Sequence, residues 1–216
     1  MVEWQTRSTQ NRMLKGVRVR IPPWLLKILE RLEMIYKNRL DSMYVIADLA
    51  DHSEIKDSLL SLIDKSPAGS MSNNTDRLNV TKVDWDKSTD FSRPWVSYLL
   101  HYLNPHIASV FKEMGFSKFL LKEIWFQQYL NRASHGWHTH GSHFTNVYYL
   151  ELDPDSPKTV LINPFTREEF IPDVKEGQTL VFPSYVIHKS PDDFFKKRKT
   201  IVSWNSDIDI EHPYTP

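Results

Sequence analysis

Histidines are concentrated in one stretch of this sequence, from Trp125 to Glu151. Four of the nine histidines lie there: His135, His138, His140 and His143. In an extended chain, side chains two residues apart point the same way, so His138 and His140 share a face that His135 and His143 do not. Two imidazoles that converge at one strand end can supply two ligands of a transition-metal site. The rest of the chain must supply a third ligand.

A candidate for the third ligand occurs further along the chain. His188 follows an apolar run, Thr179–Ile187, in which a proline ends the strand and leaves the ring beside it. Arg198 comes ten residues later, at the head of another strand-like run, and shares its face with Thr200 by parity. A guanidinium offers a planar pair of donors that fits a carboxylate. Together with His138 and His140, His188 would complete a three-histidine metal site.

The second half of the chain contains the elements that position these residues. After Gly115 the sequence becomes a series of short β-branched or aromatic runs, separated by turn signals such as Asp153-Pro154 and Glu176-Gly177. The runs are Phe119–Leu130, Thr145–Leu152, Thr159–Asn163, Glu169–Ile171, Gln178–Phe182 and Thr200–Asn205. Short, regularly spaced strands of this kind are typical of a β-sandwich or barrel.

The first half has mostly helical patterns. Pro22-Pro23 opens a run with apolar residues at helical spacing, and Ser53–Asp64 repeats that pattern. A third helical run, Arg93–Met114, should be interrupted at Asn104-Pro105. Tyr44–Leu49 is a short apolar piece, and Asn79–Trp85 is a candidate short strand.

These elements predict an α+β fold in one domain, with a helical N-terminal half packed on a jelly-roll core. The expected parts are a basic leader (1–21), a mainly helical cover (22–115), the jelly-roll core (116–208) and a tail (209–216).

The composition excludes several classes of protein. Lys and Arg number 27 against 27 Asp and Glu, so net charge gives no reason to expect nucleic acid or an anionic membrane as the main partner. The 216 residues include no cysteine, which excludes disulfides, thiolate metal sites and a cysteine nucleophile. No apolar run approaches the roughly 20 residues of a membrane span. We expect a soluble, cytoplasmic protein that does not act at a membrane.

The order of these residues resembles a known family. The sequence Tyr129…His138-x-His140…Tyr148-Tyr149-Leu150…Phe182-Pro183…His188…Arg198-x-Thr200 is similar to the 2-oxoglutarate- and Fe(II)-dependent oxygenases, in particular to a branch found in phage and bacterial genomes. The resemblance covers roughly 119–205. It implies a double-stranded β-helix, a form of jelly roll, with iron bound by an HxD/E pair and a distal histidine.

The resemblance also implies roles for individual residues. His138, His140 and His188 would hold Fe(II), while Arg198 and Thr200 would bind the distal carboxylate of 2-oxoglutarate, the cosubstrate that is consumed with O2. The remaining expected positions are Tyr129 and Tyr149 on the cosubstrate, and Trp125, Gln127, Asn131, Trp137 and His143 along a substrate pocket. The implied reaction is hydroxylation of an unidentified substrate, coupled to decarboxylation of 2-oxoglutarate to succinate.

His140 departs from the family, which has a carboxylate at this position. His143 or His135 remains an alternative second ligand. Three histidines also suit zinc or nickel, so a cupin-like metalloenzyme that does not use 2-oxoglutarate and a non-catalytic metal-binding jelly roll remain open. The sequence identifies neither the substrate, which could be a small molecule, a protein or a nucleic acid, nor the oligomeric state.

Overall fold

The structure is a computed structural model that describes residues 42–72, 78–192 and 195–209. The predicted basic leader, the helix opened by Pro22-Pro23 and all but the first residue of the predicted tail lie outside the described residues. None of the helices within the described ranges is both long enough and apolar enough to span a bilayer.

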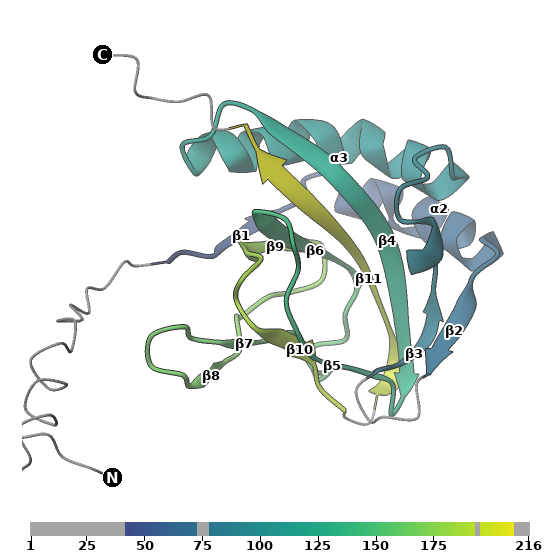
Figure 1. The fold of residues 1–216 in the computed structure, drawn as a ribbon. Helices are drawn as coiled ribbons and strands as arrows, with labels where there is room; N and C mark the ends of the chain where they lie inside the picture. The colour runs from purple at the N-terminus through teal and green to yellow at the C-terminus, as the bar shows by residue number, and fades with distance from the viewer. Residues whose placement is uncertain (1–41, 73–77, 193–194, 210–216) are drawn as a thin grey trace, which may run out of the picture. The chain divides into compact units, whose positions relative to one another are not determined.

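The described chain forms one antiparallel sheet of eleven strands that curls on itself (Figure 1). The strand order is β1-β9-β6-β11-β4-β3-β5-β10-β7-β8, with β2 paired to β3. The strands are β1 (Val45–Asp48), β2 (Gly69–Ser72), β3 (Leu78–Val83), β4 (Phe119–Asn131), β5 (Ser134–His138), β6 (Phe144–Glu151), β7 (Val160–Ile162), β8 (Glu169–Phe170), β9 (Gln178–Pro183), β10 (His188–Ser190) and β11 (Phe195–Ile208). The rings of Tyr44 and Phe170, beside the two end strands, approach to 5.2 Å between centroids, so the curl brings the ends of the sheet together.

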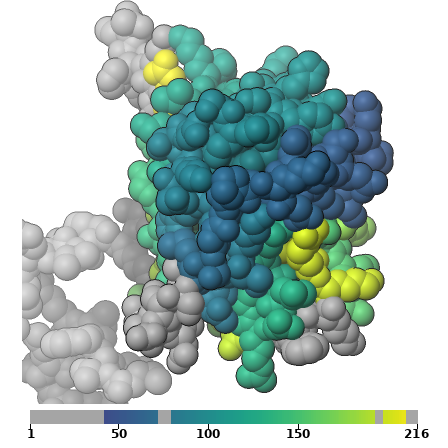
Figure 2. All heavy atoms as spheres, turned by 90° about the vertical axis from the view of Figure 1, so that its right-hand side faces the viewer, coloured from purple at the N-terminus to yellow at the C-terminus, as the bar shows by residue number. Residues whose placement is uncertain are grey.

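Two α-helices within the described residues, α2 (His52–Lys65) and α3 (Pro94–Glu113), cover the outer face of the sheet (Figure 1). Seen from the side in Figure 2, their blue and teal atoms cover much of that face. The apolar stripe of α2 buries Ile55, Leu59 and Ile63 completely. This burial against the sheet stabilises the helix, as is usual for amphipathic helices in globular proteins.

The helix α3 runs without a break through Pro105, so the predicted interruption at this position is wrong. Leu103 and Ile107, on either side of the proline, are buried against the sheet, whereas Pro105 itself faces solvent. Packing on both sides of the proline outweighs the loss of one helical hydrogen bond.

The six strands predicted after Gly115 are confirmed, and so are the helix at Ser53–Asp64 and the strand at Asn79–Trp85. The predicted helical N-terminal half is wrong over the described residues, because that part of the chain also supplies β1, β2 and β3. The strand β3 pairs with β4 and β5, and β1 pairs with β9. The first half therefore extends the sheet as well as covering it.

The alternation of side chains along β11 separates two apolar clusters. Val202 and Trp204 point outward into the core shared with α2 and α3. Ile201 points into the inner cluster, on the concave side of the curled sheet. Lys199 and Ser203 have the same parity as Ile201. The inner face of β11 therefore combines a cation and a hydroxyl with apolar residues.

Candidate metal centre

Three histidines converge on the concave side of the sheet. His138 ends β5 and His188 begins β10, and these two residues are direct partners in the antiparallel register. His140 follows two residues after β5, where its backbone N–H donates to the carbonyl of Ser184 at 3.1 Å. One nitrogen from each of the three rings lies within 4.8 Å of the other two. The predicted pairing of His138 with His140 and the placing of His188 beside them match this geometry.

Two of the three rings are oriented by the backbone. The Nδ1 atom of His138 lies 2.7 Å from the Gly136 carbonyl oxygen, and Nδ1 of His188 lies 2.9 Å from that of Val186. Because a carbonyl only accepts, Nδ1 carries the proton in both rings and donates it. Each Nε2 therefore keeps its lone pair, which is the arrangement found in metal-ligating histidines.

Burial keeps the three rings neutral. Desolvation lowers the pKa of His188 to about 2 and that of His140 to about 4, and it also lowers the pKa of His138. A metal binds the neutral imidazole, so these rings need no deprotonation at neutral pH. Within the described residues, no acidic side chain lines this pocket. Three neutral imidazoles with their lone pairs brought together fit a divalent transition metal.

The two other histidines of the stretch have different positions. The ring of His135 stacks on His138 with centroids 3.8 Å apart, and its Nδ1 accepts from Gln127 at 3.2 Å. His143 is half exposed, and its Nδ1 accepts from the backbone N–H of Ile208 at 3.0 Å. His143 is therefore outside the pocket, and its predicted place there is wrong. Its parity opposite to His140 turns it away.

Arg198 and Thr200, which were predicted to bind the distal carboxylate of 2-oxoglutarate, do not line the histidine pocket. The guanidinium of Arg198 pairs with Glu151 at 2.8 Å and with Asp64 at 2.8 Å, and the hydroxyl of Thr200 also donates to Glu151. These contacts are on the outer side of the sheet, because Arg198 and Thr200 have the parity of Val202. The arginine holds the sheet to α2.

Lys199 is the cation that enters the pocket side of β11. Its side chain is 1 % exposed and donates to the carbonyl of Pro157 at 2.9 Å and to the hydroxyl of Ser190 at 2.8 Å. Its ammonium also lies 4.5 Å from the centroid of the Tyr129 ring. Burial lowers the pKa of Lys199 to about 7, so the ammonium is easily converted to the neutral amine.

The two predicted tyrosines are both buried on the inner face. Tyr129 lines the pocket beside Lys199, and burial raises its pKa. The hydroxyl of Tyr149 donates to Thr159 at 2.7 Å, and Thr159 lines the pocket. Tyr129 is thus in position to contact a bound molecule, whereas Tyr149 acts on the pocket through Thr159.

Of the residues predicted to line a substrate pocket, Trp125 and Gln127 do so. Asn131 is exposed at the end of β4 and has a φ of 58°. Trp137 points outward with 40 % of its surface exposed, and the ammonium of Lys189 lies 4.1 Å from its ring centroid. Neither residue lines the histidine pocket, although Trp137 lines a neighbouring hollow of about 590 Å³ that shares Lys189 and Ser190 with it. Asn131 is the last residue of β4, just before a turn, and Trp137 has the opposite parity to His138.

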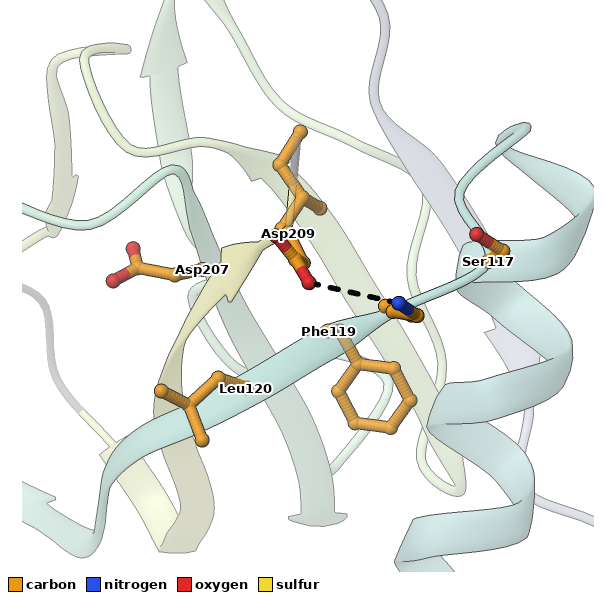
Figure 3. Close-up of a pocket in the computed structure, with 7 residues that line it drawn as sticks. Ser117, Phe119, Leu120, Asp207 and Asp209 are labelled. Carbon is orange, nitrogen blue, oxygen red and sulfur yellow. Dashed lines mark ion pairs between the residues drawn. The ribbon is translucent and has the colours of Figure 1, made fainter. Parts of the chain in front are cut away.

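The histidine pocket is small, with a cavity volume of about 30 Å³. A larger hollow of about 560 Å³ lies at the other end of β4 and β11, where Ser117, Phe119, Leu120, Asp207 and Asp209 surround it (Figure 3). In that hollow Lys118 pairs with Asp209 at 4.0 Å, both of them more than half exposed. It is far along the β4–β11 ladder from Lys199, which pairs with Tyr129. The two spaces are separate.

No family model matches the chain, and no curated protein matches it in sequence. Solved structures do match. An oxidoreductase of the 2OG-Fe(II) oxygenase family from Burkholderia pseudomallei superposes with a TM-score of 0.60 at 12% identity, over 76% of this chain and 84% of that one. A prolyl-4-hydroxylase from Pseudomonas putida gives 0.55 at 13% identity, over 76% and 92%.

A third match is a prolyl hydroxylase from Trichoplax adhaerens, which was solved in complex with a peptide fragment of the hypoxia inducible factor oxygen degradation domain. Its TM-score is 0.56 at 15% identity, over 76% of this chain and 83% of that one. The curled sheet, the two covering helices and the converging histidines thus belong to a chain that has the jelly-roll fold of the 2OG-Fe(II) oxygenases.

Proposed function

We propose that the protein is an Fe(II)- and 2-oxoglutarate-dependent oxygenase in which His138, His140 and His188 hold the iron. The observation that carries this proposal is the buried Lys199, which lies directly behind the wall of the histidine pocket and contacts the lining residues Ser190 and Tyr129, within a fold shared with such oxygenases. We assign to Lys199 the distal carboxylate of 2-oxoglutarate. This replaces the sequence-based assignment to Arg198.

The surroundings of Lys199 support that assignment. Ser190, Tyr129 and Thr159 place hydroxyl groups along the same wall of the pocket, and each can donate to a carboxylate oxygen. An ammonium on a flexible stem pairs with a carboxylate as a point charge, through charge-assisted hydrogen bonds. Bringing in an anion also favours the protonated amine, so binding draws the lysine back to its charged form.

2-Oxoglutarate needs more space than the histidine pocket has in this structure. A cavity of about 30 Å³ has room for about one water molecule, so a dicarboxylic acid needs side chains to move. Lys199 is suited to do so, because its ammonium can exchange the Pro157 carbonyl and the Ser190 hydroxyl for a carboxylate. The rings of Tyr129 and Trp125 remain as apolar walls that exclude water.

Bound Fe(II) with 2-oxoglutarate and O2 would supply oxidative decarboxylation coupled to oxidation of a substrate C–H bond. The residues of the chain contribute a dry pocket, three neutral donors and an anchor that orients the cosubstrate. We propose hydroxylation as the reaction. The Trichoplax adhaerens enzyme binds a peptide, but nothing in this pocket selects a peptide over a small molecule.

The test is an anaerobic titration of the Fe(II)-loaded protein with 2-oxoglutarate, followed by charge-transfer absorption, together with succinate release in air. Lys199→Met should weaken binding by about one to three powers of ten, because charge-assisted hydrogen bonds contribute roughly 1.5–3 kcal/mol each. Arg198→Gln is the matched control and should bind 2-oxoglutarate as the wild type does. Equal affinity in Lys199→Met, or a loss in Arg198→Gln alone, would overturn the assignment.

One observation favours a second candidate. A pocket with three histidines and no acidic residue among the described side chains is also suited to a cupin-like metalloenzyme that does not use 2-oxoglutarate. The same titration separates the two, since such an enzyme binds metal without a charge-transfer band on adding 2-oxoglutarate. A metal-binding module without activity would bind the metal and show no turnover at all.

A further inference from the structure

The third histidine differs from the other two in the way it is held. The rings of His138 and His188 are each fixed by a backbone carbonyl two residues earlier. Among the described residues, the His140 ring makes no side-chain hydrogen bond. Its neighbours are rings instead: it stacks on Trp125 with centroids 5.7 Å apart at 23° and on His188 at 5.1 Å and 13°. Another interaction must therefore orient this imidazole.

Trp125 is itself held in a row of stacked rings. Trp85 stacks on Trp125 with centroids 5.8 Å apart at 17°. The indole N–H of Trp125 is buried and finds no hydrogen-bond partner within the described part of the chain, so polar contacts do not orient this ring either. The side chain is 3 % exposed, and it lines the histidine pocket. Stacking and packing fix its plane, and through it the plane of His140.

The row begins at a buried ion pair. Trp85 opens a short 3-10 turn (Trp85–Lys87) directly after Asp84. The carboxylate of Asp84 is fully buried and accepts from Arg93, from the indole N–H of Trp95 at 2.9 Å and from the backbone N–H of Phe126 at 2.9 Å. Since Phe126 follows Trp125 in β4, one carboxylate fixes the backbone next to both tryptophans. The Trp85 and Trp125 rings are thereby held in line with the His140 ring.

We infer that Trp125, supported by Trp85, is the positioning residue for His140. Stacking on Trp125 orients the His140 ring, as a hydrogen bond to a backbone carbonyl orients the rings of His138 and His188. The inference rests on the metal centre of the proposed function and on no particular reaction. A stack restrains the plane of the ring but leaves its tautomer unset, so either nitrogen of His140 can face the metal. The metal centre thus has two ligands oriented by hydrogen bonds, His138 and His188, and one oriented by aromatic stacking, His140.

Cobalt(II) is the probe for the test, because its visible absorption reports both binding and the number of ligands. Trp125→Leu should weaken Co²⁺ binding by about 2- to 12-fold, the range that an aromatic pair supplies beyond its buried area, and should reduce the visible band. Trp125→Phe keeps a ring and should bind close to wild type, whereas Trp85→Leu should show a smaller loss. Trp137→Leu is the matched control, since this exposed tryptophan adjoins His138 and touches none of the three ligand rings.

A double-mutant cycle separates positioning from general packing. In the His140→Ala background, Trp125→Leu should cost no further Co²⁺ affinity, because the ring that it orients is gone. An equal loss in both backgrounds, or an unchanged affinity in a folded Trp125→Leu, would overturn the inference. If Trp125→Leu does not fold by circular dichroism, the same cycle is run with Trp85→Leu and read by the same rule. A wild-type protein that binds no metal would instead refute the metal centre itself.

Discussion

The buried Lys199, behind the wall of the histidine pocket, gives the sharpest test of the structure. Burial lowers the pKa of Lys199 to about 7, from the 10.5 of an exposed lysine. Between these values the unfolded chain binds a proton that the folded protein does not, so the free energy of unfolding rises with pH. Below pH 7 both states are protonated, and the full cost of burying the charge is present. Above pH 10.5 both states are neutral and the cost is gone.

The change to make is Lys199→Met, which keeps the volume of the stem and removes the amine. Each pH unit across the window is equivalent to about 1.4 kcal/mol, so the cost removed at pH 7 is as much as about 5 kcal/mol. The variant loses the hydrogen bonds to Ser190 and to Pro157, which offsets about 1–3 kcal/mol of this gain. We expect metal-free Lys199→Met to be the more stable protein at pH 7 and to lose that advantage as the pH rises to 10.

The assay is urea denaturation of the metal-free protein at pH 6, 7, 8, 9 and 10, compared with Lys199→Met. The difference in the free energy of unfolding should be constant from pH 6 to 7 and then shrink. Lys189→Met removes a lysine that pairs with Glu169 at 3.2 Å near the surface, and it serves as the control. A difference between wild type and Lys199→Met that does not change with pH would show that Lys199 titrates normally, and this would refute the reasoning.

Three further outcomes follow from other parts of the structure. Burial lowers the pKa of His188 and of His140 below the 6.5 of an exposed histidine. As the pH falls below 6.5, the unfolded chain therefore binds protons at these histidines before the folded protein does. Thermal unfolding of the metal-free protein should show that the stability is complete above pH 6.5 and is lost as the pH falls toward 4. Asp84→Asn leaves the buried Arg93 without its charged partner and should cost about 3–5 kcal/mol in chemical denaturation; a cost below 1 kcal/mol would contradict the role of this ion pair. Gly177 has a φ of +85°, and a Cβ there would lie 2.9 Å from the ring of His52, so Gly177→Ala should destabilise by about 1–3 kcal/mol, whereas Gly69→Ala, which meets nothing within 4 Å, should change much less.

The sequence predicted the strands well because each carries its own pattern. The runs from Phe119 to Asn205 alternate or are uniformly apolar between turn residues, and strand formation there requires little from distant residues. Three strands were missed: β2, β5 and β10. The last two carry His138 and His188. They are short and rich in histidine, lysine and glycine, so neither composition nor periodicity marks them. The strand conformation of β5 and β10 comes from pairing with each other and with β3 and β7 on their outer edges.

The site was predicted in part for the same reason. His138 and His140 were paired by local parity, which holds over two residues whatever the rest of the chain does. Arg198 was assigned because it lies ten residues after His188, as the resemblance implies, and because a guanidinium fits a carboxylate. Side chains alternate along a strand, however, and only one of two adjacent residues can face inward. The deciding signal was present: Val202 and Trp204 are the larger apolar pair on β11, and the helices of the outer face require them. Arg198 has their parity and therefore faces outward.

His140 and Lys199 are also related through charge. A carboxylate in place of His140 would give a site with Fe(II) and the 2-oxoglutarate dianion one net negative charge, which a permanently charged arginine would balance. With three neutral imidazoles, iron and the dianion are already balanced, so a permanent cation in a dry pocket would be left uncompensated, at a large desolvation cost. Lys199, with a pKa lowered to about 7, can be neutral while the pocket is empty and would take up a proton only as a carboxylate binds beside it. In the proposed site, Lys199 would therefore avoid the cost of a permanently buried cation in the empty pocket, a cost that an arginine at the same position would carry at all times.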